Sequence, residues 1–260
     1  MSDLATEIRV YKSDYVSRIY KLADISKNMT QKIQYYKYLS DNFLEEFKNY
    51  NKIMENYLFL NYRKSNMYFE EDNKIGSMND QELIKFSQTF FEESIFYPQS
   101  FRTSFFIQIF SVLEHELKEI CLIHFQQNKY IFSIADLKGN SDIEKAKLYL
   151  KKAGNINFDD FEPEWSYLET MRKIRNRFVH SQGEINQKHP DWNKIYSFVS
   201  SNENSLGLSN CAECLEKSEF YRLYDIDSTL TLEIQGHDFN DKMILSVKKF
   251  LNMLANKLTN

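Results

Sequence analysis

The sequence predicts a mainly α-helical bundle with a minor β element. Only three prolines and six glycines punctuate the 260 residues, and none comes before Gly76 or between Pro98 and Gly139. Apolar residues recur at steps of three and four, which is the period of a helix that buries one face. The stretch Ser228 to Ile234 alternates with period two instead, which predicts one strand or hairpin before the last helix.

The first 75 residues are expected to form a helical arm or hairpin, and residues 76–260 a helical domain. Apolar residues from Leu4 to Tyr57 keep the helical step far beyond the length of an ordinary helix. The cluster Ser40-Asp41-Asn42, with Glu45 three residues after Asn42, resembles an N-cap and offers a break between two helices. The many tyrosines of this stripe could suggest stacking on nucleic-acid bases, but packing or dimerisation is the expected role of the arm.

Three segments follow the apolar stripe that ends at Tyr57. Residues 61–76 are mixed and charged, which indicates a linker or turn. A short helix is predicted to begin after Met78-Asn79-Asp80 and to end near Pro98. The stretch from Gln99 to Asn128 has the broad apolar face of a central bundle helix.

Polar residues interrupt this central helix. Glu114 is a candidate to face a neighbouring basic helix and orient an arginine. His115 and His124 are interpreted as structural residues.

The next predicted helix begins at a capping box formed by Ser141 and Glu144, runs to about Lys152 and ends at Gly154-Asn155. An acidic loop over residues 158–163 leads into a further helix. This helix should pack on the central one, because its apolar positions keep helical steps, at Trp165, Leu168, Met171, Ile174 and Phe178.

The segment after Gly183 is less regular. The predicted strand has a candidate partner near residues 220–224, and Asp238 is expected to start a last helix with apolar residues at Val247, Leu251, Leu254 and Leu258. Cys211 and Cys214 have C-x-x-C spacing, but no second pair accompanies them and His237 alone does not complete a zinc site. We interpret these cysteines as free thiols and expect neither a metal nor a cofactor.

Composition limits the location and the partners of the protein. The net charge of −4 argues against a generally basic nucleic-acid coat, so any such contact must be local. Three cysteines do not suggest a disulfide framework, and no apolar run approaches the roughly 20 residues of a membrane span. These features, and an N-terminus without a signal-peptide pattern, predict a cytoplasmic protein with no membrane partner.

A basic stretch from Met171 to His180 stands out in this acidic chain. It contains four cations together with Asn176 and His180, and Gly183 is expected to stop the helix just after it. On a helix, Ile174 and Phe178 form an apolar edge, and Asn176 and His180 form a polar edge.

Arginine and histidine together suit phosphodiester cleavage without a metal. Histidine transfers protons near neutral pH, and arginine neutralises the charge that develops on the phosphoryl oxygens. RNA carries its own nucleophile, the 2′-hydroxyl, which favours RNA over DNA as substrate. Arg175 and His180 lie about 140° apart on a regular helix, so a distorted helix end or a second copy of the chain must complete the site.

The stretch Arg175-Asn176-Arg177-Phe178-Val179-His180 resembles the Arg-x4–6-His motif of the HEPN superfamily (higher eukaryotes and prokaryotes nucleotide-binding). The resemblance extends upstream to the Ser111-x-x-Glu114-x-x-Leu117 helix, the loop from Asp136 to Gly139, and Trp165. It implies an α-helical bundle that forms a homodimer, with two motif helices in a composite cleft. Many members are metal-independent endoribonucleases, often toxins or abortive-infection effectors in antiviral defence, that leave a 2′,3′-cyclic phosphate.

The resemblance assigns roles to individual residues. Arg175 and His180 become the catalytic pair, and Asn176 the polar residue that orients or contacts the phosphate. Apart from the resemblance, the residues themselves predict that RNA contacts the basic flank of the motif and that Glu114 supports the site. Some members are silenced when a partner protein transfers a nucleotide to a Tyr two residues after the histidine. This chain has Gln182 at that position, so silencing by nucleotide transfer is in doubt. An antitoxin or regulatory protein remains a candidate partner. The cations of the flank are Arg172, Lys173 and Arg177.

Two other interpretations stay open. A non-catalytic HEPN-like module would use the same basic helix to bind RNA, a nucleotide or a protein partner. Alternatively, Arg175 and His180 form a structural ion and hydrogen-bond cluster, and the N-terminal arm is the functional surface.

Overall fold

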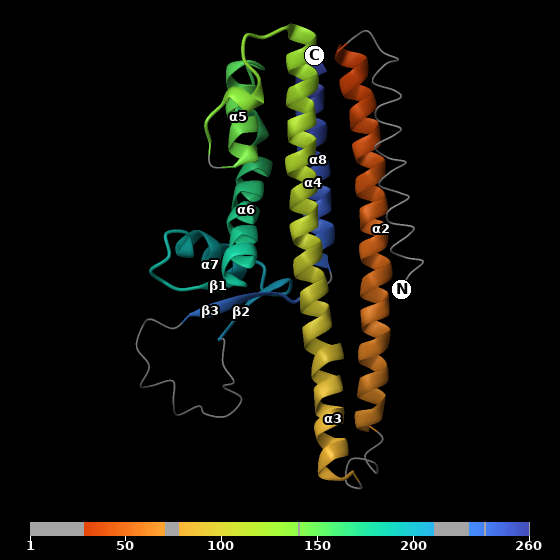
Figure 1. The fold of residues 1–260 in the computed structure, drawn as a ribbon. Helices are drawn as coiled ribbons and strands as arrows, with labels where there is room; N and C mark the ends of the chain where they lie inside the picture. Colours follow the sequence, from red (N-terminus) through yellow and green to blue (C-terminus); the bar gives the residue numbers. More distant parts are fainter. Residues whose placement is uncertain (1–28, 71–77, 140, 211–228, 237, 260) are drawn as a thin grey trace. The chain divides into compact units, whose positions relative to one another are not determined.

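The computed structural model describes residues 29–70, 78–139, 141–210, 229–236 and 238–259. The chain is mainly helical with one small antiparallel sheet (Figure 1), as predicted. It divides into two compact units, the first formed by Met1–Leu44, Leu113–Glu162 and Lys248–Asn260, and the second by Glu45–Val112 and Pro163–Val247. Three long helices contribute residues to both units: α2 (Met29–Glu70), α4 (Tyr97–Asn128) and α8 (Asp238–Thr259).

Several predictions concern residues outside this description. They are the apolar stripe from Leu4 to Ile25, the thiols of Cys211 and Cys214, His237, the candidate strand at residues 220–224, and the domain boundary near residue 75.

Helix α2 passes through Ser40-Asp41-Asn42 without a break, so the predicted interruption is wrong. Ser40 is buried, and its hydroxyl donates a hydrogen bond to the carboxylate of Glu116 instead of capping a new helix. The linker predicted from Asn61 is wrong as far as Glu70, where α2 ends. Residues 61–70 contain neither proline nor glycine, so nothing in them stops a helix.

Helix α3 (Asp80–Phe91) begins where it was predicted to begin. The Asn79 side chain accepts hydrogen bonds from the N–H groups of Gln81 and Glu82, and the Glu82 carboxylate accepts one from the Asn79 N–H.

The end predicted for this helix near Pro98 is wrong. The helical backbone continues through a π-helical segment, Glu92–Phe96, into α4. The Tyr97 N–H donates to the carbonyl of Glu92, five residues back. The wider π turn accommodates the ring and the missing N–H of Pro98, which would otherwise interrupt an α-helix.

Helix α5 (Asp142–Lys152) in the first unit confirms another predicted cap, because the Ser141 hydroxyl accepts a hydrogen bond from the Glu144 N–H at 3.3 Å. The same unit explains His124, which is buried, lies 3.1 Å from the Tyr149 hydroxyl and stacks on the Tyr130 ring. Burial lowers the pKa of His124. Its environment fits the structural role predicted for it.

The small sheet belongs to the second unit. It contains β1 (Glu184–Ile185), β2 (Leu206–Asn210) and β3 (Leu230–Ile234) in the antiparallel order β1-β3-β2. The strand predicted before the last helix is therefore confirmed as the central strand β3, and its described neighbours come from earlier in the chain. Leu232 lies opposite Leu208, and Thr231 lies opposite Glu184.

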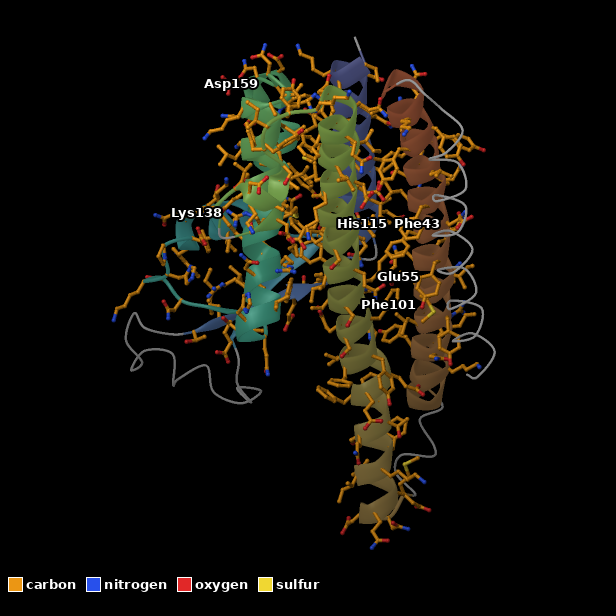
Figure 2. The ribbon with its side chains drawn as sticks, turned by 45° about the horizontal axis from the view of Figure 1, so that its top comes forward. Phe43, Glu55, Phe101, His115, Lys138 and Asp159 are labelled. Atoms are coloured by element: carbon orange, nitrogen blue, oxygen red, sulfur yellow. The ribbon has the colours of Figure 1, made fainter. Side chains whose placement is uncertain are left out.

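A charged clamp holds the second unit together around Arg102 of α4. Its Nε and Nη2 atoms each donate to the Glu55 carboxylate at 2.8 Å, and its Nη1 donates to the Gln235 carbonyl at 2.7 Å. Glu55 is only 8% exposed. Figure 2 labels Glu55 on α2 and Phe101 on α4. Arg102 therefore joins both helices to the end of β3.

Candidate functional site

Helix α6 (Glu164–Ser181) belongs to the second unit and carries the basic stretch. Its predicted core-facing edge packs into the core of that unit. The Phe178 ring lies edge-on to Phe106 of α4, with the ring centroids 6.0 Å apart. The prediction that this helix packs on the central helix is therefore confirmed. All five predicted apolar positions are buried: Trp165, Leu168, Met171, Ile174 and Phe178.

The C-terminal end of α6 is anchored to the sheet. Gln182 adopts a left-handed conformation (φ 51°), and Gly183 follows with φ 88°. The Gly183 N–H donates to the Arg177 carbonyl and the Leu232 N–H to the Gly183 carbonyl, both at 3.0 Å. The helix therefore stops close to the predicted glycine, and β3 fixes its last turn.

Arg175 and His180 point in different directions from α6. The helix stays α-helical to Ser181, so their Cα–Cβ directions differ by about 140° and the distorted end considered above does not occur. Arg175 is half-buried, whereas His180 is exposed.

Asn176 contacts Arg175 and lies on the same edge of α6 as His180. Arg175 Nη1 donates to Asn176 Oδ1 at 3.2 Å. Asn176 lies one turn before His180 on the same polar edge, because residues four apart are neighbours on a helix surface. The guanidinium of Arg175 therefore contacts the polar edge at Asn176.

The cations predicted to bind RNA differ in their surroundings. Arg172 lies 3.4 Å from the Glu169 carboxylate, and Lys173 forms an ion pair with Asp191. Arg177 is half-exposed. Glu114 is half-buried on α4 and belongs to the first unit, so its support of an arginine stays a prediction.

A stacked aromatic pair, one half-buried ring and one exposed ring, lies on α7 (Trp192–Ser200), a helix that was not predicted. The rings of Trp192 and Tyr196 stack with centroids 5.2 Å apart and planes 24° apart, and Tyr196 is 49% exposed. The Lys173–Asp191 ion pair holds the start of α7 against α6. Lys173 and His180 are seven residues apart, so the ion pair attaches the start of α7 about two turns before His180 on the same edge of α6.

Comparisons of the chain with protein-family models, with curated proteins and with solved structures found no match. The chemistry of α6 is therefore inferred from its own side chains.

Two features are absent from the described part of the chain. None of its helices combines the length and the apolar character needed to cross a membrane. No group of three or more His, Cys, Asp or Glu side chains in it is arranged to hold a metal ion.

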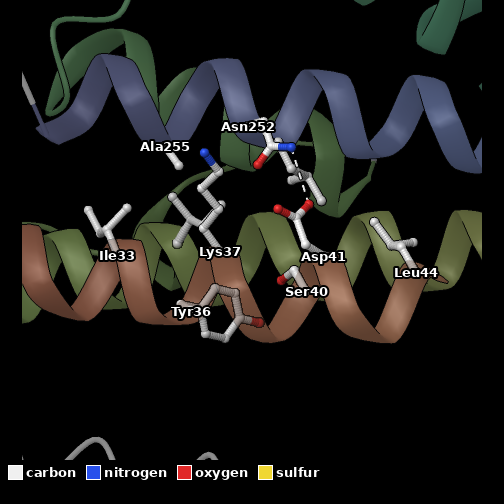
Figure 3. Close-up of a pocket in the computed structure, with 10 residues that line it drawn as sticks. Ile33, Tyr36, Lys37, Ser40, Asp41, Leu44, Asn252 and Ala255 are labelled. Carbon is white, nitrogen blue, oxygen red and sulfur yellow. Dashed lines mark hydrogen bonds between the residues drawn. The ribbon is translucent and has the colours of Figure 1, made fainter. Parts of the chain in front are cut away.

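A second polar cluster lies in the first unit, beside a small cavity between α2 and α8 (Figure 3). The cavity measures about 10 Å³, which is room for about one water molecule. Asn252 donates to the Asp41 carboxylate at 3.2 Å at its edge, and Tyr36 and Ser40 are among its lining residues. This space is too small for a nucleotide, so α6 remains the better candidate site.

Glu116 in this cluster should make stability depend on pH. Burial raises its pKa from 4.5 to about 7, although the hydroxyls of Ser40 and Tyr36 favour the charged form. A raised pKa means that the folded state favours the proton, so the contribution of Glu116 to stability is greatest below pH 4.5 and is lost as the pH rises through 7. The loss should reach about 3 kcal/mol.

The measurement is the free energy of unfolding of wild type and Glu116→Gln between pH 4 and pH 8. The variant, which cannot ionise at this position, should lack this loss, so its advantage over wild type should grow with pH. Glu45→Gln, at an exposed position, serves as the matched control and should follow wild type. A parallel pH dependence of wild type and Glu116→Gln would refute this role of Glu116.

Proposed function

We propose that the protein is a metal-independent endoribonuclease that acts as a dimer, in the role of a toxin or antiviral-defence effector. The observation that carries the proposal is the Arg175–Asn176 hydrogen bond on a helix edge that also presents the exposed His180. A general acid–base group and a phosphate-binding cation are the two components that cleavage by the 2′-hydroxyl requires.

The proposed reaction uses only these side chains. Neutral His180 takes the proton of the 2′-hydroxyl, and the 2′-oxygen attacks the adjacent phosphorus. The bond from phosphorus to the 5′-oxygen breaks, which leaves a 2′,3′-cyclic phosphate and a 5′-hydroxyl. The imidazolium formed on His180 then gives its proton to the leaving oxygen. Arg175 neutralises the charge on the phosphoryl oxygens, and Asn176 holds its guanidinium in place.

The angular separation on α6 supports a site shared by two copies. A regular helix directs Arg175 and His180 about 140° apart, so a phosphate that contacts one side chain is poorly placed for the other in the same chain. Pairing two α6 helices would offer each phosphate an arginine from one copy and a histidine from the other.

The stacked rings of α7 are expected to bind an unpaired base. Base stacking on an aromatic side chain contributes about 1–3 kcal/mol, so replacing both Trp192 and Tyr196 by Ala should weaken binding of single-stranded RNA roughly 10- to 100-fold. Phe59→Ala is the control, because Phe59 is an aromatic residue that is 56% exposed on α2. Fluorescence anisotropy with a labelled oligonucleotide measures the effect, and equal affinity of all three proteins would exclude the aromatic pair from RNA binding.

A non-catalytic RNA-binding module is the second candidate, because the stacked rings of α7 and the basic helix α6 can bind RNA without any chemistry at His180. The two functions separate in one experiment, incubation of the protein with single-stranded RNA in EDTA. The endoribonuclease should produce fragments that end in a 2′,3′-cyclic phosphate and should leave DNA of the same sequence intact. Salt-sensitive binding without cleavage would support the module instead, and a strict requirement for a divalent metal would refute the proposed mechanism.

A further inference from the structure

Helix α2 exposes apolar side chains on the side opposite its core-facing edge. Its buried residues in the second unit include Asn51, Glu55 and Leu58. On the opposite side, Ile53, Tyr57 and Leu60 are 65%, 58% and 55% exposed. These three residues, at spacings of four and three, form one continuous stripe, which we call the outer stripe.

A surface helix normally has polar residues on the side away from the core. Single exposed apolar residues are common, but a continuous stripe of them marks an interaction surface. The polar residues at both ends of the stripe indicate what covers it. Exposed Glu46 continues the same face one way and exposed Lys64 the other way.

This charge arrangement is self-complementary under a two-fold axis. Consider a second α2 that lies antiparallel to the first, with the two-fold axis passing at the level of residue 55. Glu46 of each chain then faces the partner's Lys64, and Ile53 faces the partner's Tyr57. The contact extends about 27 Å along the helix. A parallel arrangement would instead bring two glutamates together at one end and two lysines at the other.

We propose that the outer stripe is an interface with a second copy of this chain, paired antiparallel through α2. This interface is separate from a pairing of α6 helices. Phe105 of α4 stacks on Phe47 of α2, whereas its neighbour Phe106 contacts Phe178 of α6, so α2 and α6 pack on different sides of α4. Both interfaces are isologous, so together they generate assemblies larger than a dimer. The inference goes beyond the proposed function and does not depend on RNA cleavage.

Charge reversal tests the interface directly, because two single variants that each associate weakly should associate tightly when they are mixed. Glu46→Lys alone places two lysines at each end of the interface, and Lys64→Glu alone places two glutamates there. Each variant should weaken self-association through α2 roughly tenfold. When one chain of each variant pairs, the two introduced charges, which are opposite, face each other at one end of the interface. The native Lys64 and Glu46 face each other at the other end. The mixture should therefore associate as tightly as wild type.

Sedimentation velocity over a range of protein concentrations measures the association. Ile53→Asp should weaken it roughly a hundredfold, since a charge would enter the apolar centre. Phe59→Asp is the matched control, because Phe59 is 56% exposed on α2 but lies about 120° from Ile53 and should leave association unchanged.

The outcomes separate this interface from other occupants of the stripe. Failure of the mixture to recover, or unchanged association in all variants, overturns the proposal. Lower thermal stability of Ile53→Asp at unchanged association would show that another part of the same chain covers the stripe, and it also overturns the proposal. If α2 pairing is correct, Ile53→Asp loses association whether or not wild type cleaves RNA.

Discussion

His180→Ala is expected to lower the rate of RNA cleavage by roughly 10²- to 10⁴-fold, which is the usual contribution of a general acid–base group. The affinity for RNA should change little, because the basic residues and the aromatic pair on α7 remain. Single-turnover cleavage in EDTA, combined with a binding isotherm for each protein, separates the two quantities. His115→Ala is the matched control, since His115 is also exposed but lies on α4 in the first unit.

Arg175→Ala should reduce the rate by a similar factor, because the charge on the phosphoryl oxygens would lose its neutralising group. Asn176→Ala should reduce the cleavage rate by a smaller factor. Its effect should act through Arg175, because the Asn176 side chain positions the Arg175 guanidinium by the 3.2 Å hydrogen bond. In the double variant Arg175→Ala/Asn176→Ala, the second change should therefore add little. Full activity of His180→Ala or Arg175→Ala would remove these residues from the mechanism.

Arg102→Ala is expected to lower the free energy of unfolding by about 3–5 kcal/mol. The substitution leaves the Glu55 carboxylate buried without its bidentate partner, and it removes a donor from the Gln235 carbonyl. The end of β3 would then lose its link to α2 and α4. Since β3 also holds the end of α6 through Gly183, cleavage should become more sensitive to temperature.

Chemical denaturation of wild type and Arg102→Ala measures this difference. Lys118→Ala provides the control, because Lys118 and Asp142 form an ion pair in which both side chains are at least 40% exposed. The control should lose no more than about 1 kcal/mol. If Arg102→Ala and Lys118→Ala lose equal free energy of unfolding, burial of the Arg102–Glu55 pair does not determine how much that pair contributes to stability.

The helical elements were predictable from sequence wherever periodicity and capping agreed. Asn79 and Ser141 start helices as predicted, and α6 buries the five apolar positions assigned to it. Period-two alternation located β3. These features depend on short-range patterns that a single sequence contains.

The errors arose where a contact distant in sequence overrides a local signal. Ser40 resembles a cap, but Glu116, 76 residues away, accepts its hydroxyl. Pro98 resembles a helix end, but a π turn carries the helix past it. Propensity is a weak signal beside such tertiary and geometric effects.

The candidate site was predictable only in part. The motif located Arg175, Asn176 and His180 and gave their angular relation on α6. It did not reveal the Arg175–Asn176 hydrogen bond, the ion pair of Lys173 with Asp191, or the Trp192–Tyr196 stack. Two aromatic residues four apart, close after Lys188 and His189, were the available signal for the stack. This signal alone does not predict a helix, because the segment lacks a long run of apolar residues at helical spacing.

The most direct test of the shared active site mixes inactive Arg175→Ala and His180→Ala chains under conditions of subunit exchange, with EDTA present. In a mixed dimer, one of the two sites has both Arg175 and His180, so an equal mixture should recover about a quarter of the wild-type activity. Each variant alone should remain inactive. Complete exchange of subunits without any recovered cleavage would contradict a site built from two copies of α6.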